Sequence, residues 1–161
     1  MQPLLLRSDL RPGDVGAIVA MHGRLYAGEH GFDVTFEAYV SVPLGECVLR
    51  ASRRERIWVA EQKARLVGSV AVVAESPAIA QLRWFLVDPE VRGEGLGTRL
   101  LAEALAFGRA AGYERIVLWT VSTLTGAARL YQAAGFRRTD AMPAQRWGVD
   151  VVEEKYEMPL H

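Results

Sequence analysis

The sequence predicts an α/β fold in which helices flank a mixed β-sheet. Two observations lead to this prediction. Short β-rich runs joined by turns lie between residues 57 and 74 and again at the end of the chain, and a strand–helix–strand–helix alternation lies between them. Runs joined by short turns form antiparallel hairpins, whereas strands that alternate with helices form parallel pairs. We expect one sheet of about six or seven strands, with about four helices covering both faces.

The chain opens with a short strand and an amphipathic helix. Leu4 to Leu6 form an apolar run closed by polar residues, which is typical of a short strand. From Asp14, apolar residues recur at helical spacing as far as Tyr26, and Gly31 is placed to end this helix. His22 lies on the apolar face, where we expect a buried histidine with a structural role.

A second helix should begin at Asp33 or Thr35. Proline removes a backbone donor and clashes with the preceding helical turn. Pro43, followed by Gly45, should therefore break or kink this helix before Cys47.

Three β-rich runs come next. Ile57 to Ala60 and Leu66 to Ala74 are separated by a short, mainly polar segment, which predicts a hairpin. Ser76-Pro77 interrupts the pattern, and Ala80 to Val87 form the following strand.

The last part of the chain alternates helix and strand and then closes with two strands. One helix should run from Leu96 to about Ala111, followed by a strand from Ile116 to Thr120. A second helix spans Thr125 to Ala134. Strand-like stretches around Arg137 to Met142 and Val149 to Met158 end the chain.

Length and composition limit the class of protein. A chain of 161 residues suits a single domain over residues 1–161, because two ordinary domains need more residues. Nineteen basic residues balance 19 acidic ones, so no overall field attracts nucleic acid or a membrane surface. We therefore expect small-molecule or peptide partners, and neither nucleic acid nor membrane.

Disulfide, metal and export signals are missing from the sequence. Cys47 is the only cysteine, and three histidines at unrelated spacings predict no metal site. The first residues lack a basic segment followed by a long apolar core, and no apolar run reaches membrane-spanning length. These features favour a cytoplasmic protein.

The stretch from Leu86 to Leu101 carries the clearest chemical signal. Its strand ends at Val87, and three glycines then lead directly into a helical pattern: Gly93, Gly95 and Gly97. Glycine permits positive φ and close approach of a ligand, and the first turn of a helix leaves N–H donors unpaired. Together these features predict an anion site, most naturally for a pyrophosphate.

Two well-known phosphate-binding motifs do not fit this stretch. A P-loop requires Lys followed by Ser or Thr at the start of the helix, where this chain has Gly97-Thr98-Arg99. A dinucleotide fingerprint requires its third glycine where this chain has Thr98. The spacing therefore argues against a nucleotide-binding protein.

Two segments resemble signatures of one enzyme family. The hexapeptide Arg92-Gly93-Glu94-Gly95-Leu96-Gly97 resembles Arg/Gln-x-x-Gly-x-Gly/Ala, which binds the pyrophosphate of coenzyme A in the GNAT family of N-acetyltransferases. The segment from Ala127 to Phe136 resembles Ala-x-x-Leu-Tyr-x-x-x-Gly-Phe, whose helix flanks the coenzyme thiol. The resemblance implies a GNAT fold and acetyl-CoA as the cofactor, with CoA as product. The implied cofactor-binding residues are Leu86, Val87, Arg92, Gly93, Glu94, Gly95, Leu96, Gly97, Thr98, Ala127 and Tyr131.

A narrower resemblance concerns the neighbouring strands. Residues 80–87 and 117–120 look like the acetyltransferase half of bacterial fusions with MarR-type regulators. The overall likeness covers residues 57–160 well. It extends to the two N-terminal helices only in position, where the family usually frames its acceptor site.

The resemblance also implies catalytic roles. Backbone N–H groups near Leu86 would polarise the thioester carbonyl, and Tyr131 would protonate the departing thiolate. Acetyl transfer to an amine further needs a base, for which we select Glu29. The other base candidates are His30, Asp33, Glu75 and Asp150. The acceptor site would include Tyr26, His30, Arg83 and Trp84.

Three departures from the family pattern affect the site. Arg83 and Trp84 stand where many members carry an acid on the central strand, so the usual base is missing. Leu124 replaces a frequent Asn on the coenzyme side, and Val121 replaces a polar residue.

We expect an enzyme that moves the acetyl group of acetyl-CoA to a primary amine of a small molecule or peptide, directly within a ternary complex. The alternative is an acyl-CoA-binding regulatory module with little turnover, which would explain the missing strand acid. A homodimer is an open option for its assembly.

Overall fold

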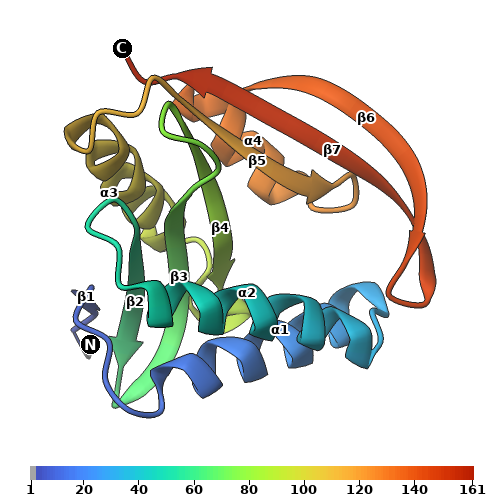
Figure 1. Cartoon of the computed structure of the whole chain (residues 1–161). Coiled ribbons are helices and arrows are strands. Elements are labelled where there is room, and N and C mark those ends of the chain that lie inside the picture. The colour runs from blue at the N-terminus through green and yellow to red at the C-terminus, as the bar shows by residue number, and fades with distance from the viewer. Residues whose placement is uncertain (1–2) are drawn as a thin grey trace.

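The structure is a computed structural model that describes residues 3–161. Within these residues a seven-stranded sheet has the order β1-β2-β3-β4-β5-β7-β6, and all neighbours pair antiparallel except β4 and β5 (Figure 1). The strands are β1 (Leu5–Arg7), β2 (Arg56–Gln62), β3 (Arg65–Ala74), β4 (Ile79–Val87), β5 (Arg115–Val121), β6 (Arg137–Arg146) and β7 (Val149–Pro159). The helices are α1 (Asp14–His30), α2 (Val34–Arg50), α3 (Leu96–Ala110) and α4 (Thr125–Ala134), with a short 3₁₀ turn, η1 (Pro89–Val91), before α3. None of these helices combines the length and apolar character that crossing a bilayer requires.

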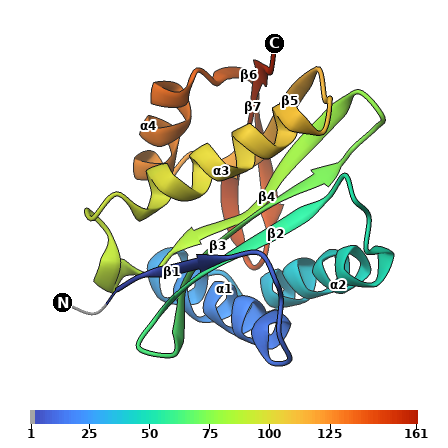
Figure 2. The same ribbon diagram turned by 90° about the vertical axis from the view of Figure 1, so that its left-hand side faces the viewer.

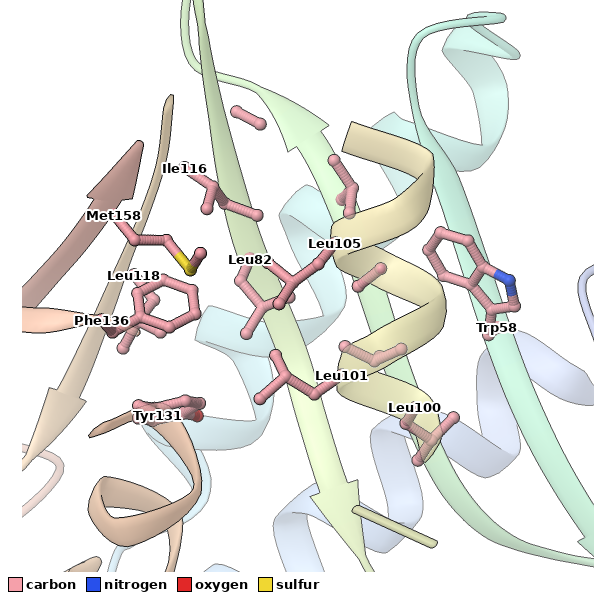
Figure 3. Close-up of a cluster of buried hydrophobic side chains, with 14 of the residues drawn as sticks. Trp58, Leu82, Leu100, Leu101, Leu105, Ile116, Leu118, Tyr131, Phe136 and Met158 are labelled. Atoms are coloured by element: carbon pink, nitrogen blue, oxygen red, sulfur yellow. The ribbon is translucent and has the colours of Figure 1, made fainter. Parts of the chain in front are cut away.

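Helices cover both faces of the sheet, as predicted. Figure 2 shows α3 lying across one face, with α1 and α2 on the other. Consecutive residues of β2 therefore enter different cores: Trp58 packs on the α3 side (Figure 3), and Val59 packs with α1 and α2. A strand buried on both faces has no alternating polar side, which is why residues 57–60 are all apolar.

Helix α2 is continuous, so the predicted break at Pro43 is wrong. One buried stripe packs against the sheet on both sides of the proline: Phe36, Val40, Leu44 and Cys47. Burial of each such side chain contributes about 1.5–3 kcal/mol. Four of them outweigh the roughly 3 kcal/mol that an interior proline costs a helix.

Strands β4 and β5 separate along their length. They pair only over residues 79–81 and 115–117, although β4 continues to Val87 and β5 to Val121. A bulge in β4 accompanies the separation, because Ser69 lies opposite Leu86 while Ala71 lies opposite Arg83. The two strands leave between their far ends the space in which the candidate site lies.

The hairpin of β6 and β7 is longer than predicted. Strand β6 continues past Met142 to Arg146 and includes Pro143, which an edge strand tolerates because one side of its backbone faces solvent. Figure 1 shows the hairpin arching towards the junction of α1 and α2. There the N–H of Asp33 donates to the carbonyl of Trp147 at 2.9 Å, which holds the tip of the hairpin in place.

Candidate active site

A cavity of about 670 Å³ lies between the diverging ends of β4 and β5. Helices α1 and α2, the glycine loop, the first turns of α3 and α4, and the tip of the β6–β7 hairpin complete its walls. From the predicted cofactor set it is lined by Leu86, Val87, Arg92, Gly93, Gly95, Leu96, Gly97, Thr98, Ala127 and Tyr131. From the predicted catalytic and acceptor sets it is lined by Tyr26, Glu29, His30, Arg83 and Trp84. Glu94 is exposed on the same loop and does not border the cavity.

The glycine loop forms an open cradle at the start of α3. Gly93 and Gly95 both have φ +83°, which side-chain-bearing residues rarely adopt. A Cβ built on Gly95 would meet no atom within 4 Å, so the space above the loop is free for a ligand. The first N–H groups of α3 have no partner within the helix and no capping side chain. These features fit a pyrophosphate.

Gly97 has a different role from the other two glycines. A Cβ at this position would lie 3.0 Å from Leu130 of α4 and 3.6 Å from Phe85 of β4. The absence of a side chain lets α3 approach α4 closely. The third glycine of the motif thus shapes the packing beneath the cradle.

Arg92 connects the loop to α1. Its Nε donates to the carbonyl of Val87 at 3.0 Å, while Nη1 and Nη2 donate to the two carboxylate oxygens of Glu29 at 2.9 and 3.0 Å. These hydrogen bonds from Arg92 hold the pKa of Glu29 below its usual range. Glu29 is consequently ionised throughout the neutral range.

Tyr131 lies in an aromatic cluster at the floor of the cavity. Its ring centroid is 5.9 Å from that of Phe85, 5.7 Å from Phe136 and 5.9 Å from Tyr156. The residue is 5% exposed, and burial raises the pKa of its hydroxyl. Within residues 3–161 the hydroxyl has no hydrogen-bond partner in the protein. Its proton is therefore available to a ligand.

A bulge places Arg83 and Trp84 on the same face of β4. Val70 of β3 lies opposite two residues instead of one, and Trp84 has φ +49°. The Oγ of Ser69 donates to the Trp84 carbonyl at 2.6 Å and secures this conformation. Strict alternation would have placed the two side chains on opposite faces.

Of the remaining base candidates, one borders the cavity and the other three do not. His30 borders the cavity, with its Nδ1 3.4 Å from the hydroxyl of Thr123. Asp33 instead caps α2, where it accepts the N–H of Thr35 at 2.9 Å. Glu75 and Asp150 are exposed and do not border this cavity.

Sequence reasoning missed two sets of cavity residues. Glu153 of β7 borders the cavity and pairs with Arg146 at 2.6 Å. The pairing of β5 with β7 brings it opposite Val121, and no local pattern reveals that register. The second set is aromatic and comes from α2, the segment before it, and the hairpin tip: Phe32, Phe36, Tyr39 and Trp147.

Comparison with known proteins places these features in a family. The model of the acetyltransferase (GNAT) family matches residues 25–136. Human N-acetyltransferase 8B is 38% identical over 87 residues, which are 51% of this chain and 38% of the relative. N-acetylaspartate synthetase of Danio rerio is 33% identical over 103 residues, which are 63% of this chain and 33% of the relative. The chain thus spans only about a third to two fifths of the length of these two relatives.

Solved structures share the fold over nearly the whole chain. An N-acetyltransferase from Staphylococcus aureus has a TM-score of 0.81 at 17% identity, covering 99% of both chains. A protein assigned as an acetyltransferase from Salmonella typhimurium, solved with its cofactor acetyl-CoA, has a TM-score of 0.80 at 18% identity, covering 98% of this chain and 94% of that one. The family model covers more than half of the chain, and this chain therefore belongs to the GNAT acetyltransferase family.

Proposed function

We propose that this chain is an acetyl-CoA-dependent N-acetyltransferase that transfers the acetyl group directly to a primary amine in a ternary complex. One observation carries the proposal: a single cavity is bordered by the pyrophosphate cradle, by Tyr131 and by an acceptor region on α1, α2 and the hairpin tip. Donor and acceptor can therefore meet without a covalent enzyme intermediate. Names of relatives such as N-acetyltransferase 8B support the reaction class.

Two parts of the cavity bind acetyl-CoA: the glycine loop, and the space between the diverging ends of β4 and β5. Acetyl-CoA supplies an acyl group activated as a thioester. The backbone around Gly95 and the first turn of α3 hold its pyrophosphate, with Arg92 beside them. Beyond Gln81 the side of β4 that faces β5 has no strand partner, so N–H groups near Leu86 are free to polarise the thioester carbonyl.

Two side chains carry out the proton transfers, one as the base and one as the acid. Glu29, kept ionised by Arg92, accepts the proton that the amine loses, directly or through a water. Burial raises the pKa of the Tyr131 hydroxyl, so the group is protonated at neutral pH but is a weaker acid than a free phenol. It donates its proton to the sulfur as the carbon–sulfur bond breaks and negative charge builds on that atom, and it regains a proton from solvent after the products leave. The two residues border the same cavity.

The test is transfer from acetyl-CoA to a panel of primary amines, followed by thiol release and by mass spectrometry of the products. We expect acetylated product, sequential kinetics and no acetylated protein. Binding of CoA without transfer to any amine would instead support an acyl-CoA-binding regulatory module, in line with the resemblance to regulator fusions. If ATP or NAD raised the melting temperature and CoA did not, both the N-acetyltransferase and the acyl-CoA-binding module would be contradicted.

A further inference from the structure

Arg83 is a cation without an acidic partner in the acceptor half of the cavity. Its guanidinium lies 5.8 Å from the ring centroid of Tyr39 and 5.0 Å from that of Trp84. Among residues 3–161, no carboxylate forms an ion pair with it and no group accepts a hydrogen bond from it. The side chain is half-buried and borders the cavity. A guanidinium in this position can bind an incoming carboxylate through two parallel hydrogen bonds.

The acidic residues of the cavity are already paired. Glu29 is held by Arg92, and Glu153 by Arg146. A polyamine carries several ammonium groups, and in the cavity each would need a free carboxylate in place of its lost hydration. Glu29 and Glu153 are not free, because each is already paired with an arginine. The charge pattern therefore favours an acceptor with one amine and an acid over a polyamine.

Aromatic rings form the wall beside Arg83. The ring centroid of Trp147 lies 4.9 Å from that of Phe32, 5.0 Å from Phe36 and 5.3 Å from Tyr39. These four residues border the cavity from α2, the segment before it, and the hairpin tip. A wall of this kind favours a large apolar or aromatic group.

Trp147 holds a backbone conformation that a bulky residue rarely adopts. It forms with Gly148 the two-residue loop between β6 and β7, at φ +54° and +81°. Two positive φ values define a type I′ turn, for which Asn-Gly is strongly preferred and tryptophan is not. The tip is pinned to α2, since a Cβ on Gly148 would lie 2.8 Å from Asp33 Oδ2. Lys63 and Ala64 of the β2–β3 turn also have positive φ, so the conformation alone does not mark a ligand site; Trp147 is tied to the acceptor by its place on the cavity wall.

From these observations we infer that the acceptor is a primary amine that carries a carboxylate and a large apolar or aromatic side chain. Arg83 binds the carboxylate, and the wall formed by Phe32, Phe36, Tyr39 and Trp147 receives the side chain. L-Phenylalanine is a probe of this class. The inference rests on the proposed function and narrows its acceptor.

The first experiment compares acceptors with and without the carboxylate. Steady-state kinetics are measured with L-phenylalanine and with phenethylamine for the wild type, Arg83→Gln and Arg53→Gln. Arg53 is an exposed arginine outside the cavity and serves as the matched control. Arg83→Gln should raise KM for L-phenylalanine about tenfold to a hundredfold and leave phenethylamine near wild type. Because each acceptor is compared between proteins, its intrinsic reactivity cancels.

The second experiment tests the aromatic wall with Trp147→Asn. Asparagine suits the turn, so the hairpin should fold, while the ring is lost. We expect KM for L-phenylalanine to rise about tenfold and KM for L-alanine to stay near wild type. Circular dichroism and melting curves check that the variant is folded.

The outcomes separate this inference from the proposed function. If Arg83→Gln impairs both acceptors equally, or if Trp147→Asn impairs L-alanine as much as L-phenylalanine, the acceptor class is wrong and acetyl transfer still stands. If neutral amines are acetylated and L-phenylalanine is not, the acceptor class is again wrong, while acetyl transfer still stands. If no amine is acetylated, the proposed function fails and this inference fails with it.

Discussion

The carboxylate of Glu29 binds the guanidinium of Arg92 through two hydrogen bonds, of 2.9 and 3.0 Å, and thereby joins the end of α1 to the glycine loop. The pair places the candidate base beside the residue that opens the pyrophosphate signature. It also lowers the pKa of Glu29, which makes the carboxylate a weaker base than a free one. Two roles, proton acceptor and anchor of Arg92, are thus combined in one side chain.

Replacement of Glu29 by glutamine separates these two roles. If Glu29 accepts the proton, Glu29→Gln should lower kcat by about a hundredfold to ten-thousandfold. Affinity for acetyl-CoA should not fall, because the variant removes a negative charge beside the proposed pyrophosphate site. Steady-state kinetics and calorimetric titration with CoA measure both effects.

Glu153→Gln is the matched control for this experiment, because Glu153 borders the same cavity and is also paired with an arginine. It should retain most of kcat. A normal kcat in Glu29→Gln, with an altered affinity for CoA, would reduce Glu29 to an anchor of Arg92.

Gly95→Val should weaken CoA binding while the protein remains folded. Valine is strained at φ +83°, and its side chain would occupy the open space above the cradle. Calorimetric titration with CoA measures the loss. Gly16→Ala is the control, since Gly16 lies within α1 and a Cβ there would meet nothing within 4 Å. A folded Gly95→Val protein that binds CoA as tightly as wild type would show that the pyrophosphate site is elsewhere.

The features that sequence predicted are those encoded locally. Glycine spacing before a helix, as at Gly95, determines turn geometry within a few residues, and the apolar periods of α1 and α3 are readable in the same way. Pro43 misled the prediction for α2 because its penalty is local, whereas the packing that outweighs it comes from the sheet.

The proposed acceptor half of the cavity depends on contacts that are distant in sequence. Trp147 reaches the cavity because the β6–β7 hairpin extends to α2, and Glu153 because β7 pairs with β5. The bulge that turns Arg83 and Trp84 to one face requires Ser69 on the neighbouring strand. No pattern within one segment encodes these relationships.

His22 should make the protein less stable as the pH falls. It is buried in α1, where its Nδ1 lies 2.8 Å from the Ile18 carbonyl, and burial lowers its pKa to about 4. Between that value and the unfolded pKa of about 6.5, the unfolded state binds a proton that the folded state does not. The free energy of unfolding should therefore decrease as pH falls through this window, by about 3 kcal/mol in total.

Urea unfolding at about pH 7.5 and about pH 4.5 measures this dependence. In His22→Gln the decrease should be smaller than in wild type, whereas His161→Gln, at an exposed histidine, should behave as wild type. Equal pH dependence in all three proteins would show that His22 does not contribute.

Tyr131→Phe tests the proposed proton donor at the floor of the cavity. Phenylalanine keeps the ring that packs against Phe85, Phe136 and Tyr156 and removes only the hydroxyl, which has no protein partner among residues 3–161. Melting temperature and affinity for acetyl-CoA should therefore stay near wild type, while kcat falls by about a hundredfold to ten-thousandfold. Tyr113→Phe provides the opposite control. That hydroxyl donates to the carbonyl of Arg54 at 2.6 Å, and neither residue lines the cavity, so its loss should reduce stability alone. Full activity of Tyr131→Phe across the pH range would mean that solvent protonates the thiolate.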